Sequence, residues 1–143
     1  TEYLEKIFTE AISEPDVVAL SIATRPDCLG NDVLNLLEKL NKIKPVWVEL
    51  GLQTIHEDTA EYIRRMYPLS VYDSAVENLH KIGINVITHI ILGLPNESKE
   101  MMLESVKYVG DKTDGIKIYA MNTNSESLMC LQLMSISTFS AIA

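Results

Sequence analysis

One apolar strand pattern carries a carboxylate and an amide on the same side. In Val46–Gln53 (VWVELGLQ), one face is continuously apolar and the other holds Glu49, Gly51 and Gln53. Residues two apart in a strand point to the same face, so these three should line one wall. A carboxylate there is costly unless it is paired, and Lys117 from a later strand is the candidate partner. Gly51 leaves room for a bound group to approach the backbone. We therefore expect this face to be the wall of a site.

Each candidate residue also has a structural interpretation. Glu49 could belong to a structural ion pair, and His89 could be a core histidine whose ring is satisfied by backbone groups. Arg25 and Asp27 could pair locally within a turn. Cys28 could be a nucleophile, but a cysteine without a nearby acid–base partner is usually just a small buried residue.

Several common site types are excluded by the sequence. It has no P-loop, no GxGxxG, no HExxH and no serine elbow. The two cysteines, Cys28 and Cys130, lie far apart without metal-ligand spacing, and we expect His56 and His80 to be solvated. The formal net charge of −8 makes nucleic-acid binding by this segment an unfavoured interpretation.

Helical and strand patterns alternate along the 143 residues. The expected helices are Tyr3–Ile12, one capped by Asn31 and running to about Leu40, Glu57–Arg65, Ser70–Gly83 (with Ser70 and Asp73 as a capping box) and Glu97–Val109. The expected strands are Val17–Ile22, Val46–Gln53, Asn85–Leu92 and Ile116–Ala120. Apolar strands that alternate with helices predict an α/β fold with a parallel sheet. Four strands are too few to close a barrel, so the sheet is either part of a doubly wound fold or an arc of a (β/α) barrel.

The unusual residues fall where such a sheet binds ligands, at the carboxyl ends of its strands. They are Thr24 to Cys28 after the first strand, Gln53 and Thr54 at the second, His89 and Gly93 at the third, and Lys117 and Tyr119 on the fourth.

Three segments, in their order and spacing, resemble strands three to five of radical S-adenosylmethionine (radical SAM) enzymes. The segments are SIATRPDCL, VWVELGLQTIHEDTAEYIRR and HIILGLPNESKEMM, and the later GIKI resembles strand six. The resemblance is greatest to an uncharacterised iron–sulfur oxidoreductase branch near the Elongator-type and oxygen-independent coproporphyrinogen oxidase-type groups. It implies that residues 1–121 form an arc of a partial (β/α)6 TIM-like barrel, with about four parallel strands and covering helices.

The resemblance also implies cofactors and site residues. S-adenosylmethionine would be cleaved reductively to a 5′-deoxyadenosyl radical that abstracts hydrogen from an unknown substrate. The positions that would contact this cofactor are Thr24, Arg25, Gln53, Arg65, His89 and Gly93. Glu49 and Lys117 would line the lumen without an assigned chemical role. Ala23 stands where related groups often carry a glutamate.

One family element is missing from the sequence. Radical SAM enzymes hold a [4Fe-4S] cluster with a CxxxCxxC loop, and neither this loop nor a GGE-like element occurs here. We therefore expect the cluster only in a longer protein, with its ligands in an N-terminal portion, and an inactive fragment. The start at Thr1 instead of Met fits this expectation. Residues 122–143 do not match the family, and we expect a divergent apolar tail, either helical or disordered.

Two other interpretations stay open at this point. Lys117 could form a Schiff base in a metal-independent lyase or aldolase, with Glu49 as acid–base partner. Alternatively, the chain could be a non-catalytic module that binds a ligand or partner. An exposed sheet edge or the tail would favour a homo-oligomer. We expect a cytoplasmic setting, since there is no signal peptide and no bilayer-spanning segment.

Overall fold

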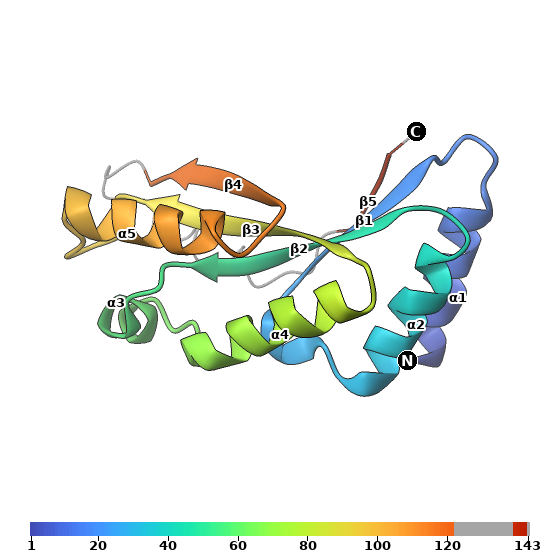
Figure 1. Cartoon of the computed structure of the whole chain (residues 1–143), viewed down its shortest axis with the longest axis horizontal. Helices are drawn as coiled ribbons and strands as arrows, with labels where there is room; N and C mark the ends of the chain where they lie inside the picture. The colour runs from blue at the N-terminus through green and yellow to red at the C-terminus, as the bar shows by residue number, and fades with distance from the viewer. Residues whose placement is uncertain (122–138, 143) are drawn as a thin grey trace.

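The computed structural model describes residues 1–121 and 139–142 (Figure 1). Its elements, in chain order, are α1 (Glu2–Ser13), β1 (Ala19–Thr24), a 3-10 turn η1 (Pro26–Cys28), α2 (Asn31–Asn41), β2 (Val46–Gln53), α3 (Glu57–Tyr62), α4 (Leu69–Lys81), β3 (Asn85–Leu92), α5 (Lys99–Gly110), β4 (Gly115–Ala120) and β5 (Phe139–Ile142). The alternation of helices and strands follows the predicted pattern closely.

The strands form one sheet in the order β4-β3-β2-β1-β5. β1 to β4 are parallel, and neighbours in the sheet are also neighbours in the chain, as in an arc of a β/α barrel. The predicted fold class, with four parallel strands and covering helices, is confirmed. β5 was not predicted: it pairs antiparallel with β1, from Ala19 opposite Ile142 to Ile22 opposite Phe139.

The expectation of a helical or disordered tail is therefore wrong for residues 139–142, which form a strand. The remainder of that tail, residues 122–138 and 143, lies outside the described residues. The domain boundary after residue 121 stays a prediction.

The apolar face of β2 forms the centre of the hydrophobic core. Val46, Val48, Leu50 and Leu52 are each 3% exposed or less, and they pack with apolar residues of α2 and α4. Figure 1 shows α4 running beside β2 and β3, and α5 beside β3 and β4. By strand alternation, the opposite side of the sheet carries Ser21, Glu49, Gly51, His89 and Lys117, and we call this side the inner face.

Three predicted helix ends are corrected by the structure. α2 is capped by Gly30, not Asn31, and α4 starts at Leu69 after Pro68, without the predicted Ser70 capping box. α3 ends at Tyr62 because Arg64 (φ 55°) and Met66 (φ 70°) adopt the left-handed region, which a helix does not contain. Arg65 therefore lies in a loop and not at a helix end.

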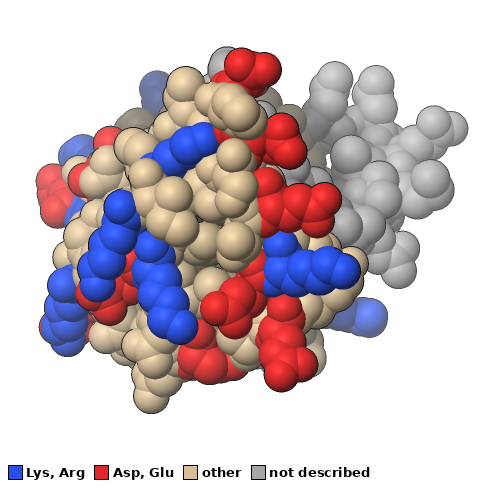
Figure 2. All heavy atoms as spheres, turned by 90° about the vertical axis from the view of Figure 1, so that its right-hand side faces the viewer, with Lys and Arg blue, Asp and Glu red and all other residues tan. Residues whose placement is uncertain are grey.

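The surface has mixed charge on the face seen in Figure 2, where basic and acidic side chains are interspersed and no continuous basic patch is visible. In the described part of the chain, none of the helices has the length and apolar character needed to cross a membrane.

Candidate functional site

Glu49 is the centre of a polar cluster on the inner face. Lys117 Nζ donates to both of its carboxylate oxygens, at 2.7 and 2.6 Å. Ser21 Oγ donates to Oε1 at 2.7 Å, and His89 Nε2 lies 2.7 Å from Oε2. The predicted pairing of Glu49 with Lys117 is thus confirmed, and two further partners join it. We call these four residues the Glu49 cluster.

The cluster fixes the charge state of its carboxylate. Burial alone would raise the pKa of Glu49, but the hydrogen bonds from Lys117, Ser21 and His89 outweigh it and lower the pKa from 4.5 to about 2. An ionised carboxylate can only accept hydrogen bonds, so His89 Nε2 must carry the hydrogen. Nδ1 is then left without a partner among the described residues, and the ring lies 5.4 Å from that of Tyr119. The interpretation of His89 as a histidine satisfied by backbone groups is wrong.

Gln53, four residues after Glu49, ends β2 in an unusual backbone conformation. Its φ is 70°, and Thr54 N donates to Leu52 O at 2.9 Å, which closes a three-residue turn around it. We call Leu52–Thr54 the Gln53 turn. The pairing with β3 shifts register here, as in a β-bulge. A positive φ costs a residue other than glycine about 1–3 kcal/mol, and such strain concentrates at functional sites.

The Gln53 side chain lies against Gly51 and makes no hydrogen bond to the described residues. A Cβ added to Gly51 would lie 2.7 Å from Gln53 Nε2, so a larger residue here would push the flexible end of Gln53 out of its present position. The space predicted at Gly51 for a ligand is thus taken by Gln53 itself. None of the described residues hydrogen-bonds the Gln53 amide, which is half-buried and has donors and an acceptor to offer.

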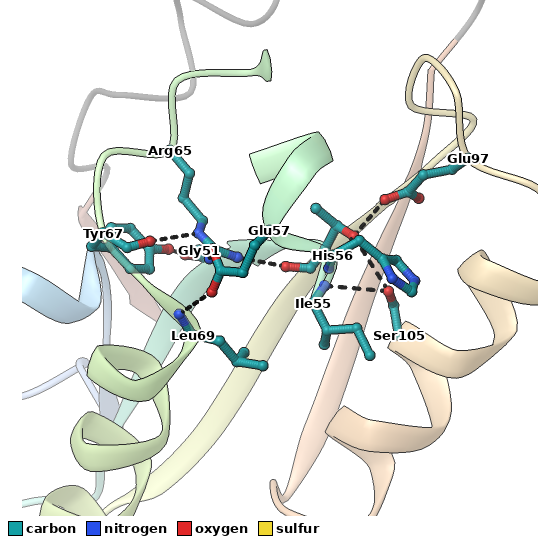
Figure 3. Close-up of polar contacts among 10 residues, drawn as sticks. Gly51, Ile55, His56, Glu57, Arg65, Tyr67, Leu69, Glu97 and Ser105 are labelled. Atoms are coloured by element: carbon teal, nitrogen blue, oxygen red, sulfur yellow. Dashed lines mark hydrogen bonds and ion pairs between the residues drawn. The ribbon is translucent and has the colours of Figure 1, made fainter. Parts of the chain in front are cut away.

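A network from the loop after α3 surrounds the Gln53 turn (Figure 3). Arg65 Nη1 donates to Thr54 O at 2.6 Å, Nε to Tyr67 O at 2.9 Å and Nη2 to Glu57 Oε2 at 2.8 Å. The other Glu57 oxygen accepts from Leu69 N, the first residue of α4, at 2.6 Å. The Arg65 side chain is only 1% exposed, so its charge is neutralised and shielded within the protein.

Tyr67 belongs to this network and was missed in the sequence. Its hydroxyl donates to Gly51 O, and the centre of its ring lies 5.6 Å from Arg25 Cζ and 5.0 Å from Arg65 Cζ. Burial raises the pKa of Tyr67, so the hydroxyl remains a donor. No sequence pattern links Tyr67 to a glycine sixteen residues earlier.

The other side of the same strand end is joined to α5. Thr54 Oγ1 donates to Glu97 and lies 3.4 Å from Ser105 Oγ (Figure 3). His56 Nε2 donates to Met101 O at 2.9 Å. The His56 side chain is 19% exposed, so the expectation of a solvated histidine is wrong at this position. His80 is 40% exposed and pairs with Asp114 at 3.0 Å.

The remaining predicted residues lie at the ends of β1 and β3. Arg25 forms the expected local pair with Asp27, with bonds of 2.9 and 2.6 Å. The Thr24 hydroxyl makes only a long contact of 3.5 Å to Arg25 O. Gly93 has φ 81°, and a Cβ there would meet Met121 O at 3.3 Å, so both backbone and space favour glycine.

The residues present do not fit an iron–sulfur cluster. Three thiolates hold such a cluster in radical SAM enzymes, and this sequence has two cysteines in total. Cys28 is exposed, contrary to the buried position expected for it, and Cys130 lies outside the described residues. No group of three or more metal-binding side chains occurs among the described residues.

Comparisons with known proteins agree with this fold. The radical SAM superfamily profile matches residues 1–109. Uncharacterized protein YtqA of Bacillus subtilis (strain 168) is 48% identical over 122 residues, which make up 85% of this chain and 38% of YtqA.

Two solved structures share the fold. The archaeal Methanocaldococcus infernus Elp3 with an N-terminal deletion has a TM-score of 0.68 at 24% identity, covering 94% of this chain and 33% of that one. Coproporphyrinogen III oxidase (HemN) of Escherichia coli has a TM-score of 0.70 at 18% identity, covering 93% and 30%. The chain thus spans about two fifths or less of these proteins. Since the family profile covers most of its length, this chain belongs to the radical SAM superfamily.

Proposed function

We propose that this chain is the S-adenosylmethionine-binding part of a radical SAM iron–sulfur oxidoreductase. One observation supports the proposal most strongly: a strained Gln53 with an unused amide at the carboxyl end of β2. Ligands of parallel β/α folds bind at this edge of the sheet. Strain next to unused hydrogen-bonding capacity is expected at a binding residue.

The residues of the chain supply hydrogen bonds and shape in this proposal. The Gln53 amide and the Thr24 hydroxyl bond the ribose hydroxyls, and His89 accepts a hydrogen bond through Nδ1. Gly93 gives the backbone after β3 its left-handed conformation, and Arg25 borders the same edge from β1. Arg65 lies near the same edge, where it binds Thr54 O.

The cluster belongs to another part of the protein in this proposal, since the two cysteines here do not fit it. When bound, S-adenosylmethionine and a [4Fe-4S] cluster supply the reductive radical chemistry of the family. This chain orients the cofactor and excludes water from it, and the fragment alone is inactive. We propose in addition that chains associate through β4, which lies at one edge of the sheet.

No observation favours the Schiff-base alternative. A lysine nucleophile needs a free neutral amine, whereas Lys117 binds both oxygens of an ionised carboxylate. Glu49 is likewise committed to three partners. Borohydride trapping of a carbonyl compound on Lys117 would support the Schiff-base alternative and contradict the radical SAM proposal.

The proposal is tested by titrating the isotope-labelled 143-residue chain with S-adenosylmethionine and following backbone amide resonances. Millimolar ligand should shift the resonances of Gln53, His89 and Gly93, and leave those of the distant α1 helix in place. Gln53→Leu should weaken the titration about five-fold, the effect of about one hydrogen bond. An absence of shifts at the β2 and β3 ends, with cofactor or with adenosine, would contradict the proposal.

A further inference from the structure

Two peptide carbonyls, one just before the Gln53 turn and one at its last residue, accept hydrogen bonds from side chains of one loop. On one side, Gly51 O accepts from the Tyr67 hydroxyl. On the other, Thr54 O accepts from Arg65 Nη1 at 2.6 Å. Of the two carbonyls between them, that of Leu52 accepts from Thr54 N within the turn. These two hydrogen bonds from the loop hold the backbone before and after the left-handed Gln53, and we call Tyr67 and Arg65 the clamp.

The loop that supplies the clamp is itself built around Arg65. Its two neighbours, Arg64 and Met66, both have positive φ, so Arg65 stands between two left-handed residues. Arg65 Nε binds Tyr67 O at 2.9 Å, which fixes one half of the clamp to the other. Glu57 then ties Arg65 Nη2 to the first residue of α4. Such a costly loop conformation persists only when the surrounding contacts determine it.

Arg65 has little to offer a ligand directly. Three of its nitrogens donate to protein oxygens, and its side chain is 1% exposed. The guanidinium keeps two further N–H groups, one on each Nη, but the side chain is 1% exposed, so a cofactor reaches them only if the residues that cover Arg65 move. The geometry therefore favours an action of Arg65 through the backbone.

We propose that Arg65 and Tyr67 are positioning residues that hold Gln53 in its left-handed turn and so present its amide to the nucleoside part of S-adenosylmethionine. The ligand in this inference rests on the proposed function, whereas the clamp on Gln53 does not. The guanidinium of Arg65 then contributes to binding without touching the cofactor. Arg25, whose guanidinium also lies over the Tyr67 ring, connects the clamp to the end of β1.

A double-mutant cycle tests the clamp in the 143-residue chain, with Tyr67→Phe, Gln53→Gly and the double variant. Tyr67→Phe removes only the hydroxyl and should lower the melting temperature. Glycine adopts a positive φ without support, so the same change should lower it by less than half as much in the Gln53→Gly background. Tyr72→Phe is the matched control: it removes a buried hydroxyl bonded to Thr88 at 2.9 Å, away from the turn, and should act equally in both backgrounds.

Ligand titration then separates positioning from direct contact. Tyr67→Phe and Arg65→Lys should each move the backbone resonances of residue 53 before any ligand is added. Each should then weaken the S-adenosylmethionine titration about five-fold or more. Tyr67→Phe alone is sufficient should Arg65→Lys fail to fold.

Additive effects of Tyr67→Phe and Gln53→Gly would overturn the inference. So would an Arg65→Lys variant that loses affinity while residue 53 keeps its wild-type resonances, since that result indicates direct contact. If the wild-type chain shows no response to S-adenosylmethionine, the proposed function fails while the cycle still decides whether the clamp exists.

Discussion

Glu49 and Gln53 lie on the same strand, four residues apart, and their side chains are in opposite situations. Every oxygen of Glu49 is bonded, to Ser21, His89 and Lys117. The amide of Gln53 has no partner among the described residues, and its backbone is strained. A polar side chain whose hydrogen-bonding groups are all used within the protein is explained by its contribution to stability alone. A strained residue with unused hydrogen-bonding groups is better explained by a ligand.

The Glu49 cluster has a structural role that follows from its strands. Ser21 is on β1, Glu49 on β2, His89 on β3 and Lys117 on β4, so each parallel strand contributes one side chain. The hydrogen bonds of the Glu49 cluster therefore link the four parallel strands across the inner face of the sheet. Removing the central charge of the cluster should cost stability, whereas changing Gln53 should mainly affect binding. This contrast can be tested by mutation.

The largest effect is expected for Glu49→Gln as a function of pH. The folded pKa of Glu49, about 2, lies below the ordinary value of 4.5, so the unfolded chain takes up the proton first as pH falls. The stabilisation is complete above pH 4.5 and is lost toward pH 2, and it amounts to about 2–3 kcal/mol. Urea unfolding of both proteins across this range should show the difference shrinking as pH falls.

Other carboxylates also titrate in this range, which is why the variant is needed as a reference. The pKa of Asp114 is lowered too, by hydrogen bonds from Val86 N and His80 that outweigh its burial. These groups are unchanged in Glu49→Gln and cancel in the difference. A difference that stays constant from pH 7 to the acid limit would show that the Glu49 charge does not stabilise the fold.

A smaller effect is expected for Lys117→Met, which leaves the buried carboxylate with Ser21 and His89 as its partners. Breaking a fully buried ion pair costs about 3–5 kcal/mol and a surface pair at most about 1 kcal/mol. Lys117 is 47% exposed while Glu49 is 9% exposed, so we expect about 1–2 kcal/mol in urea unfolding at neutral pH.

Lys81→Met is the matched control for Lys117→Met. Lys81 pairs with Glu77 at 3.1 Å on the surface of α4, and both side chains are more than 60% exposed. Its loss should cost less than about 0.5 kcal/mol. If both variants lose the same free energy of unfolding, the Lys117–Glu49 pair contributes no more to stability than a surface ion pair does.

Much of the Glu49 cluster could be predicted from the sequence because strand geometry is regular. A period of two placed Glu49 on the inner face, and parallel order brought Lys117 within reach. The Gln53 turn could not be predicted in this way. Its positive φ depends on Tyr67 and Arg65, and their contacts arise from a loop whose conformation no periodicity describes. The β5 pairing was missed for a similar reason, since the charge-free tail has no clear period.

The smallest effect is expected for Gln53→Gly, and its sign is the informative part. Relief of the left-handed conformation is worth about 1–2 kcal/mol, and the greater freedom of glycine in the unfolded chain offsets about 0.5–1 kcal/mol of that gain. The Glu49 cluster and the contacts of Tyr67 and Arg65 are kept, so unfolding in urea should show a net stabilisation of about 0–1.5 kcal/mol. Gln53→Ala, which keeps the strain and loses the same amide, should show no gain. Both variants should bind S-adenosylmethionine more weakly than the wild type. A Gln53→Gly variant that is less stable than Gln53→Ala would mean that the left-handed turn carries no strain, and Gln53 would then be as structural as Glu49.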